Sequence, residues 1–81
     1  MDDKKIIKTL ATCKIGEKVK VLKLSADAGL KQRFISFGIM KEAVVEILEH
    51  SPAKSTLEIK VGKMRVALRA KEAEMIEVEA V

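Results

Sequence analysis

The chain has 81 residues, of which 35% are charged and 48% are apolar, and its formal net charge is +4. A chain of this length buries only about 60–65% of the surface that its unfolded form exposes. We therefore expect one domain over residues 1–81, with a single core from about residue 10 to residue 79. The composition is too apolar for a disordered tail and too charged for a membrane protein, which excludes both classes.

The sequence carries no targeting or membrane-spanning signal. No apolar run approaches the roughly 20 residues that span a bilayer. The opening MDDKKIIKTL lacks the apolar stretch and the cleavage site of a signal peptide. The one cysteine, Cys13, cannot form an internal disulfide, which fits a reducing compartment. We therefore expect a cytoplasmic protein that does not insert into the membrane.

Charge is distributed unevenly along the chain. The C-terminal end is locally acidic, whereas lysines gather in the first third, at Lys4, Lys5, Lys8, Lys14, Lys18, Lys20 and Lys23. A mild basic excess of this kind favours an acidic partner, a nucleic acid or an anionic membrane surface.

The first predicted strand is followed by a short helix. KVKVLKL, residues 18–24, alternates lysines with Val19 and Val21, the period of two of a strand with one buried face, and Leu22 is a further candidate for that face. Downstream, apolar residues at i, i+4 and i+7 mark one helical face. Asp27 is placed to cap this helix and Gly38 to end it. The three residues of that face are Leu30, Phe34 and Phe37.

Four further segments alternate in the same way and predict strands: VVEILE (44–49), LEIKV (57–61), MRVAL (64–68) and MIEVEAV (75–81). Pro52 marks the loop between the first two of these. Only Gly62 and Lys63 separate the next two, which predicts a tight hairpin with a type I′ or II′ turn. AKEAEM, just before the last strand, predicts a single helical turn.

About five short antiparallel strands with one helical insertion favour a small barrel that closes its edges on itself. A mainly β, SH3-like barrel with one or two short helices is the leading candidate. An OB-fold has the same number of strands and a similar size, so the pattern alone leaves both folds open.

The sequence offers no constellation for catalysis, metal binding or nucleotide binding. Cys13 and His50 supply too few ligands for a zinc site, and Cys13 lacks an evident base for nucleophilic chemistry. We expect a partly buried, unreactive thiol at Cys13 and a solvated loop residue at His50. Glu72 and Glu74 are expected on a solvated turn. The glycines form no phosphate-binding loop. We therefore expect neither an enzyme nor a cofactor.

A small basic barrel that binds RNA or single-stranded nucleic acid is the main alternative function. Recognition of unpaired bases depends on aromatic stacking, and the only aromatic residues, Phe34 and Phe37, lie on the predicted core face. The same deficit argues against a groove for proline-rich peptides. Nucleic-acid binding is therefore not the function that we expect.

The stretch from Leu30 to Leu48 contains the candidate partner-binding residues. Its apolar side chains can simply fill the barrel, with Met40 in a gap: Leu30, Phe34, Ile35, Phe37 and Ile39. In the other interpretation, the edge of the helix and an exposed segment after Gly38 present basic and apolar groups together, as protein interfaces do. Arg33 and Arg69 can equally be tied to carboxylates. The candidate partner-binding residues are Lys31, Arg33, Ile39, Met40 and Lys41, with Gly38 and Gly62 as structural turn residues.

Two segments, KQRFISFGIM (31–40) and VGKMRVALRAKEAEMIEV (61–78), resemble the FeoA family of bacterial ferrous iron transport accessory proteins. The family has an apolar-Gly-apolar triplet and a closing segment close to iALR..eA..I.V. The closing segment matches at Ala67, Leu68, Arg69, Glu72, Ala73, Ile76 and Val78, and the resemblance runs from about Leu10 to Val78.

The resemblance implies an SH3-like, cytosolic, non-enzymatic protein. It also implies a partner, the membrane ferrous iron transporter (FeoB-type), contacted through its cytosolic GTPase region and regulated by that contact. Where the family often has proline or glycine after the triplet, this chain has residues 40–43, MKEA, so a left-handed turn residue is less easily accommodated there.

A barrel of this type has two further possible roles. It also occurs as the C-terminal domain of metal-dependent repressors, but this chain has no room for a helix-turn-helix, so direct control of transcription is not expected. An exposed strand edge or an apolar patch around Met40 could support weak self-association.

Overall fold

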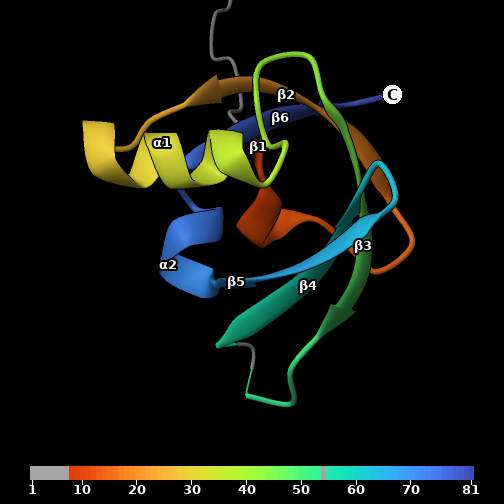
Figure 1. The fold of residues 1–81 in the computed structure, drawn as a ribbon. Coiled ribbons are helices and arrows are strands. Elements are labelled where there is room, and N and C mark those ends of the chain that lie inside the picture. Colours follow the sequence, from red (N-terminus) through yellow and green to blue (C-terminus); the bar gives the residue numbers. More distant parts are fainter. Residues whose placement is uncertain (1–7, 54) are drawn as a thin grey trace, which may run out of the picture.

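The computed structural model describes residues 8–53 and 55–81, so Lys4 and Lys5 of the predicted lysine group lie outside the described residues. Within the described residues the elements follow in the order β1 (Lys8–Thr9), the 3₁₀ helix η1 (Leu10–Thr12), β2 (Lys18–Leu24), α1 (Ala28–Ser36), β3 (Val44–His50), β4 (Thr56–Val61), β5 (Met64–Arg69), α2 (Ala70–Ala73) and β6 (Ile76–Ala80) (Figure 1). All five predicted strands and both predicted helices are therefore confirmed. The additional strand, β1, has two residues, too few for a periodic pattern.

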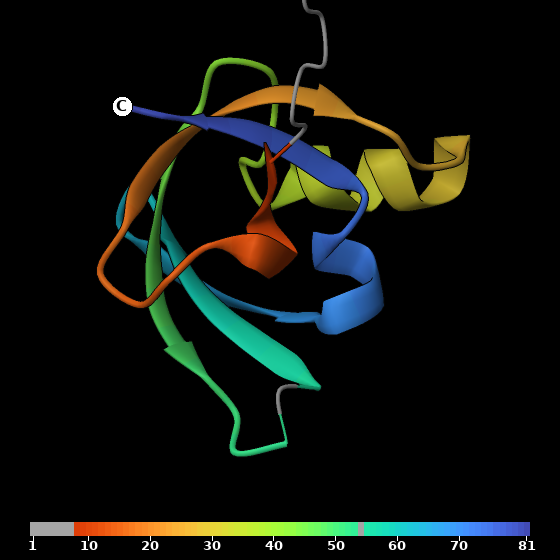
Figure 2. The same ribbon diagram turned by 180° about the vertical axis from the view of Figure 1, so that it is seen from behind.

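The strands form one antiparallel sheet in the order β1-β6-β2-β3-β4-β5. The sheet curls strongly around its concave face, with η1 inside the curl and α1 and α2 side by side at one end, as seen from both sides (Figure 1, Figure 2). The loop between α1 and β3 returns to β2, where the Glu42 N–H donates to the Val21 carbonyl at 2.7 Å. This end of the molecule therefore brings β2, α1 and the Met40–Ala43 segment together.

The core is made by the inward side chains of the alternating strands. Burial alternates along β4 and β5 as the period of two predicts. Phe34 enters from α1 and Leu10 from η1, and both are fully buried. Each such apolar side chain contributes about 1.5–3 kcal/mol to folding. The strand residues of the core are Val19, Val21, Val45, Ile47, Leu57, Ile59, Val61, Val66, Leu68, Ile76 and Val78.

The β4–β5 hairpin has the two-residue turn that the sequence predicts. Val61 pairs with Met64 across the ladder, which leaves Gly62 and Lys63 as the loop. Gly62 has a φ of 61°, whereas Lys63 is not among the described residues with positive φ. A positive φ at the first loop residue alone is the sign pattern of a type II′ turn, which favours glycine at that position.

Strand β2 contains a bulge at Leu22 that shifts the alternation of the side chains after it. Val21 pairs with Val78 and Lys23 with Glu77, so Leu22 is the extra residue between two consecutive pairs. Leu22 follows buried Val21, points outward and is 40% exposed. The expectation that it faces the core is wrong, because with Val19 and Val21 buried the period of two already directs it outward. The bulge instead leaves Lys23 exposed and Leu24 partly buried.

An ion pair joins the start of the described chain to the turn before β2. The Lys8 ammonium donates to Glu17 Oε2, and the Lys14 N–H donates to Glu17 Oε1 at 2.9 Å. The hydrogen bond from Lys8, followed by that from Lys14, holds the pKa of the Glu17 carboxyl below its ordinary value of 4.5. Ionised Glu17 is thus favoured by the folded state.

This pair predicts a pH dependence of stability. The pKa of Glu17 is lower in the folded state than in the unfolded state. Its contribution to the free energy of unfolding is therefore complete above the unfolded-state pKa and is lost as the pH falls through the folded-state pKa. Between about pH 6 and pH 2, the Tm of Glu17→Gln should therefore fall less than that of the parent. Calorimetry checks this, with Glu49→Gln, an exposed carboxylate on β3, as the control for one lost charge. Equally steep profiles for the parent and Glu17→Gln would contradict the prediction.

Candidate functional site

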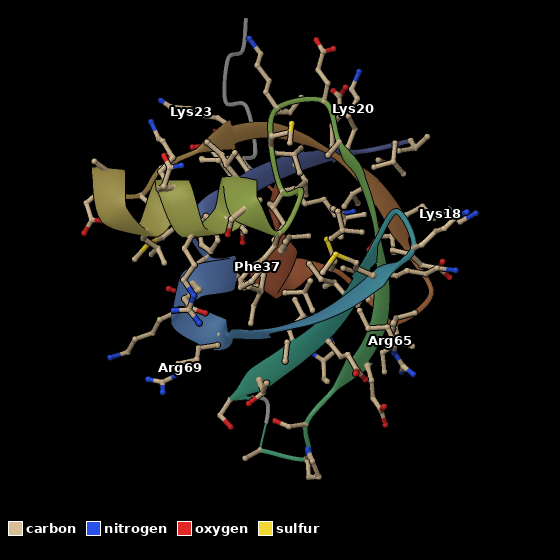
Figure 3. The ribbon with its side chains drawn as sticks, in the orientation of Figure 1. Lys18, Lys20, Lys23, Phe37, Arg65 and Arg69 are labelled. Atoms are coloured by element: carbon tan, nitrogen blue, oxygen red, sulfur yellow. The ribbon has the colours of Figure 1, made fainter. Side chains whose placement is uncertain are left out.

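A groove between α1, the end of β2 and the loop after α1 collects basic and apolar side chains. We call it the lysine-rimmed groove, and its seven residues are Leu22, Lys23, Leu24, Lys31, Ile35, Met40 and Lys41. In Figure 3, Lys23 lies on the β2 side of α1, opposite the side on which Phe37 and Arg69 are found. The groove thus includes three of the five candidate partner-binding residues: Lys31, Met40 and Lys41.

Helix α1 supplies two residues of the groove by its rotation. Asp27 Oδ1 accepts the Leu30 N–H at 2.9 Å, which confirms the predicted N-cap. Phe34 is fully buried, and the next residue, Ile35, is turned about 100° around the helix and is 40% exposed. Lys31 lies one turn before Ile35 on the same face. The interpretation that places Ile35 in the core is therefore wrong.

The end of α1 is a Schellman motif that separates Ile39 from Met40. The Gly38 N–H donates to the Ile35 carbonyl and the Ile39 N–H to the Phe34 carbonyl, both at 2.9 Å. Gly38 has a φ of 89°, as expected of the residue that ends the helix. This motif brings Ile39 against Phe34, and Ile39 is fully buried. Its expected exposure is wrong, so Ile39 supports the groove from below while Met40 lines it.

The loop after Met40 is closed by a left-handed residue. Glu42 has a φ of 73° and is the one non-glycine residue with positive φ in the part of the chain that the structure describes. The Ala43 N–H donates to the Met40 carbonyl at 3.0 Å, and the Val21 N–H to the Ala43 carbonyl at 2.8 Å. The left-handed turn is therefore formed without glycine or proline, because the bonds within the loop and to β2 offset its cost.

Relieving this conformation should stabilise the protein. A non-glycine residue in the left-handed region costs about 1–2 kcal/mol, and glycine costs about 0.5–1 kcal/mol in backbone entropy. We expect Glu42→Gly to raise the free energy of unfolding by about 0.5–1 kcal/mol. Lys41→Gly, next to it and without positive φ, should lower it by a similar amount. Urea unfolding measures both, and a loss in Glu42→Gly would contradict the prediction.

Arg33 lies on the other side of α1 from the groove. Its Nη1 is 3.4 Å from Glu72 Oε2, and its guanidinium carbon is 5.8 Å from the centre of the Phe37 ring. Glu72 also accepts the backbone N–H of Arg69 at 3.0 Å, at the start of α2. Glu72 is thus a partly buried structural residue with 15% of its side chain exposed, and the expectation of a solvated carboxylate is wrong. The expected tie between Arg33 and a carboxylate is confirmed.

Cys13 and His50 meet at the opposite end of the barrel. His50 is the last residue of β3, half-buried, with Nε2 3.1 Å from the Cys13 carbonyl oxygen. Its prediction as a solvated loop residue is wrong. Cys13 is 4% exposed, and burial is the main cause that raises the pKa of its thiol above the ordinary value. Among residues 8–53 and 55–81 we find no group of three or more His, Cys, Asp or Glu residues that could hold a metal ion.

The remaining groove residues, Leu22, Lys23, Leu24 and Ile35, are missing from the sequence-based candidates. Ile35 could have been found, because the helical face fixed by Phe34 and Phe37 turns it outward. The burial of Ile39 could also have been found, since a hydrophobic residue just after a helix-ending glycine commonly packs on the last turn. The outward direction of Leu22 also follows from the period of two set by Val19 and Val21. The directions of Lys23 and Leu24 could not be predicted, because nothing in KVKVLKL marks a bulge.

A family model and a curated relative identify the family of this chain. The model of the FeoA domain matches residues 8–80. The chain is 33% identical over 73 residues to a Campylobacter jejuni protein provisionally named Fe(2+) transport protein A, and the match covers 90% of this chain and 99% of that protein.

Among solved structures, FeoA of Stenotrophomonas maltophilia is 25% identical, with a TM-score of 0.78 and 89% of each chain covered. That structure is described as a complex with zinc and as an SH3 domain protein possibly acting as a bacterial ferrous iron transport activating factor. The fold is therefore SH3-like, as predicted, and not an OB-fold.

A manganese-dependent transcriptional repressor shares the fold, with a TM-score of 0.86 at 20% identity. The match covers 98% of this chain but 39% of the repressor, which agrees with the barrel being one part of such proteins. No helix in the described part of the chain is long and apolar enough to cross a membrane.

Proposed function

Because the chain belongs to the FeoA family, we propose that it is a non-enzymatic accessory protein of ferrous iron uptake that binds the membrane ferrous iron transporter and regulates it. The family match and the names of its relatives support the role in iron transport. We place the contact on the cytosolic GTPase region of the transporter, in the cytoplasm.

The lysine-rimmed groove is the surface that we assign to this contact. It is the observation that carries the proposal, because it combines exposed apolar side chains with lysines on one side of the molecule. Apolar contacts surrounded by charged groups are the usual composition of a protein–protein interface. Within the candidate residues, Lys31, Met40 and Lys41 make the contact, whereas Arg33 and Ile39 hold the helix and its end in place.

The aromatic residues support a protein partner over a nucleic acid. Phe34 is fully buried, and Phe37 is half-buried beneath the Arg33 guanidinium. Neither ring therefore offers an open face on which an unpaired base could stack. Binding of single-stranded RNA by the purified protein, with an affinity that falls steeply as salt rises, would contradict this part of the proposal.

Recovery of the transporter from cell membranes tests the proposal. The tagged protein should recover the ferrous iron transporter, and Met40→Asp combined with Lys41→Glu should reduce the recovery about tenfold or more, the equivalent of about 1.4 kcal/mol. Met64→Asp combined with Lys63→Glu is the matched control, since it makes the same two changes at an exposed methionine and lysine of the β4–β5 hairpin. Circular dichroism verifies the fold of each variant.

The outcomes separate the function from the site. Equal recovery by the parent and by both variants would support the proposed partner but would show that the contact lies elsewhere on the surface. Failure of the parent to recover the transporter, together with unchanged ferrous iron uptake in cells that lack this protein, would overturn the proposed function.

A further inference from the structure

We propose that the lysine-rimmed groove accepts an acidic amphipathic segment of its partner, in which one or two large apolar side chains are flanked by carboxylates. The proposal rests on the proposed function only for the identity of the partner. The chemistry of the segment follows from the groove itself.

The charge of the groove has one sign. Lys23 comes from β2, Lys31 from α1 and Lys41 from the following loop, and none of the seven lining residues is acidic. The ion pairs found among residues 8–53 and 55–81 use other basic side chains, so no carboxylate within these residues pairs with the three lysines. A second surface hollow, near the hairpin, has Glu46 between Lys18 and Lys60 and is therefore of mixed charge. The single sign favours carboxylates on the segment that binds.

The floor of the groove is apolar and held in place. It contains Leu22, Ile35 and Met40, three of the seven large apolar side chains exposed in the described part of the chain, with 40%, 40% and 45% of their surface accessible. Leu22 points outward from β2, which pairs with β6 on both sides of it. The Schellman motif fixes the backbone before Met40, and the hydrogen bond from the Ala43 N–H to the Met40 carbonyl fixes it after Met40. Because these positions are fixed before binding, little ordering is needed, and Met40 can adapt its side chain to the occupant.

The shape of the site favours a protein segment over a lipid surface. The apolar side chains are less than half exposed and lie in a hollow between two elements, so a flat bilayer surface cannot bury them. Adsorption to a membrane needs an apolar face that enters the boundary between headgroups and acyl chains. A side chain projecting from a partner segment can enter the hollow while its acidic neighbours contact the lysines.

Site-specific photo-crosslinking tests this inference in cells that contain the transporter. A p-benzoylphenylalanine is placed at Met40 in one protein and at Met64 in the matched control, and the crosslinked peptide is identified by mass spectrometry. We expect crosslinks from position 40 and not from position 64. We also expect the captured transporter segment to carry at least two carboxylates around a large apolar residue.

A synthetic peptide of the captured segment then measures the charge contribution in purified components. Changing its Glu and Asp residues to Gln and Asn should weaken binding about tenfold or more in fluorescence anisotropy. Each of Lys23→Gln, Lys31→Gln and Lys41→Gln should weaken it about 2–5-fold, as expected of exposed charge pairs. Lys63→Gln on the hairpin is the matched control and should leave the affinity unchanged.

The possible results are distinguishable. Recovery of the transporter with crosslinks only from position 64, or from position 40 to a segment without carboxylates, overturns this inference and leaves the proposed function standing. Crosslinks from position 40 to a second copy of the chain, or binding to vesicles with anionic lipids in place of the peptide, overturns it as well. Loss of both the crosslink and the recovery of the transporter overturns the inference and the proposed function together.

Discussion

Replacing Ile39 with alanine is expected to lower the free energy of unfolding by about 2–5 kcal/mol. Ile39 is fully buried against Phe34 at the end of α1, so the shorter side chain removes apolar contacts and leaves a cavity in the core. A domain of this size has a total stability of about 5–15 kcal/mol, so the loss is a large fraction of it.

The neighbouring residue is the matched control. Met40 is 45% exposed, and Met40→Ala should change the free energy of unfolding by no more than about 0.5 kcal/mol. Urea unfolding followed by far-ultraviolet circular dichroism measures both variants, because the chain has no tryptophan or tyrosine for fluorescence. Similar losses in the two variants would contradict the arrangement in which one side chain fills the core and the next lines the groove.

The fold was largely predictable from sequence because one face of each strand is directed to solvent and the other to the core. Val45 and Ile47 are buried and alternate with less buried neighbours, and the same holds for Leu57 and Ile59, so the period of two is kept in the structure. The hairpin at Gly62 was predictable because a two-residue loop needs positive φ. The choice between an SH3-like barrel and an OB-fold was not predictable. Alternation shows which residues face inward, but it does not show the order in which the strands pair.

The site was less predictable because it depends on departures from these periods. The bulge that leaves Lys23 exposed and Leu24 partly buried comes from pairing with β6, more than fifty residues away, and no local pattern reports it. Glu42 adopts a left-handed conformation because its loop is bonded to β2. Arg33 and Lys31 are two residues apart in sequence but face α2 and the groove respectively. Of the five candidate residues predicted from sequence, Lys31, Met40 and Lys41 line the groove, whereas Arg33 and Ile39 do not.

Replacing Gly38 with alanine is the second large effect that we expect. Gly38 has a φ of 89°, where a side chain costs about 1–2 kcal/mol. A Cβ at this position would also lie 3.2 Å from Val61 Cγ1, closer than ordinary van der Waals contact. The two effects together predict a loss of about 2–3 kcal/mol in the free energy of unfolding.

A double-mutant cycle separates the two causes. Val61→Ala removes the methyl group that the new Cβ would meet, so Gly38→Ala should cost less in that background, by about 0.5–1 kcal/mol, while the backbone strain remains. An equal cost in both backgrounds would show that strain alone opposes the substitution.

Gly38 ends α1 one residue before buried Ile39 and two residues before exposed Met40. Gly38→Ala should therefore also displace Met40 and weaken recovery of the partner, even at temperatures where the variant stays folded. Full recovery by a folded Gly38→Ala variant would instead mean that the groove does not depend on how the helix ends.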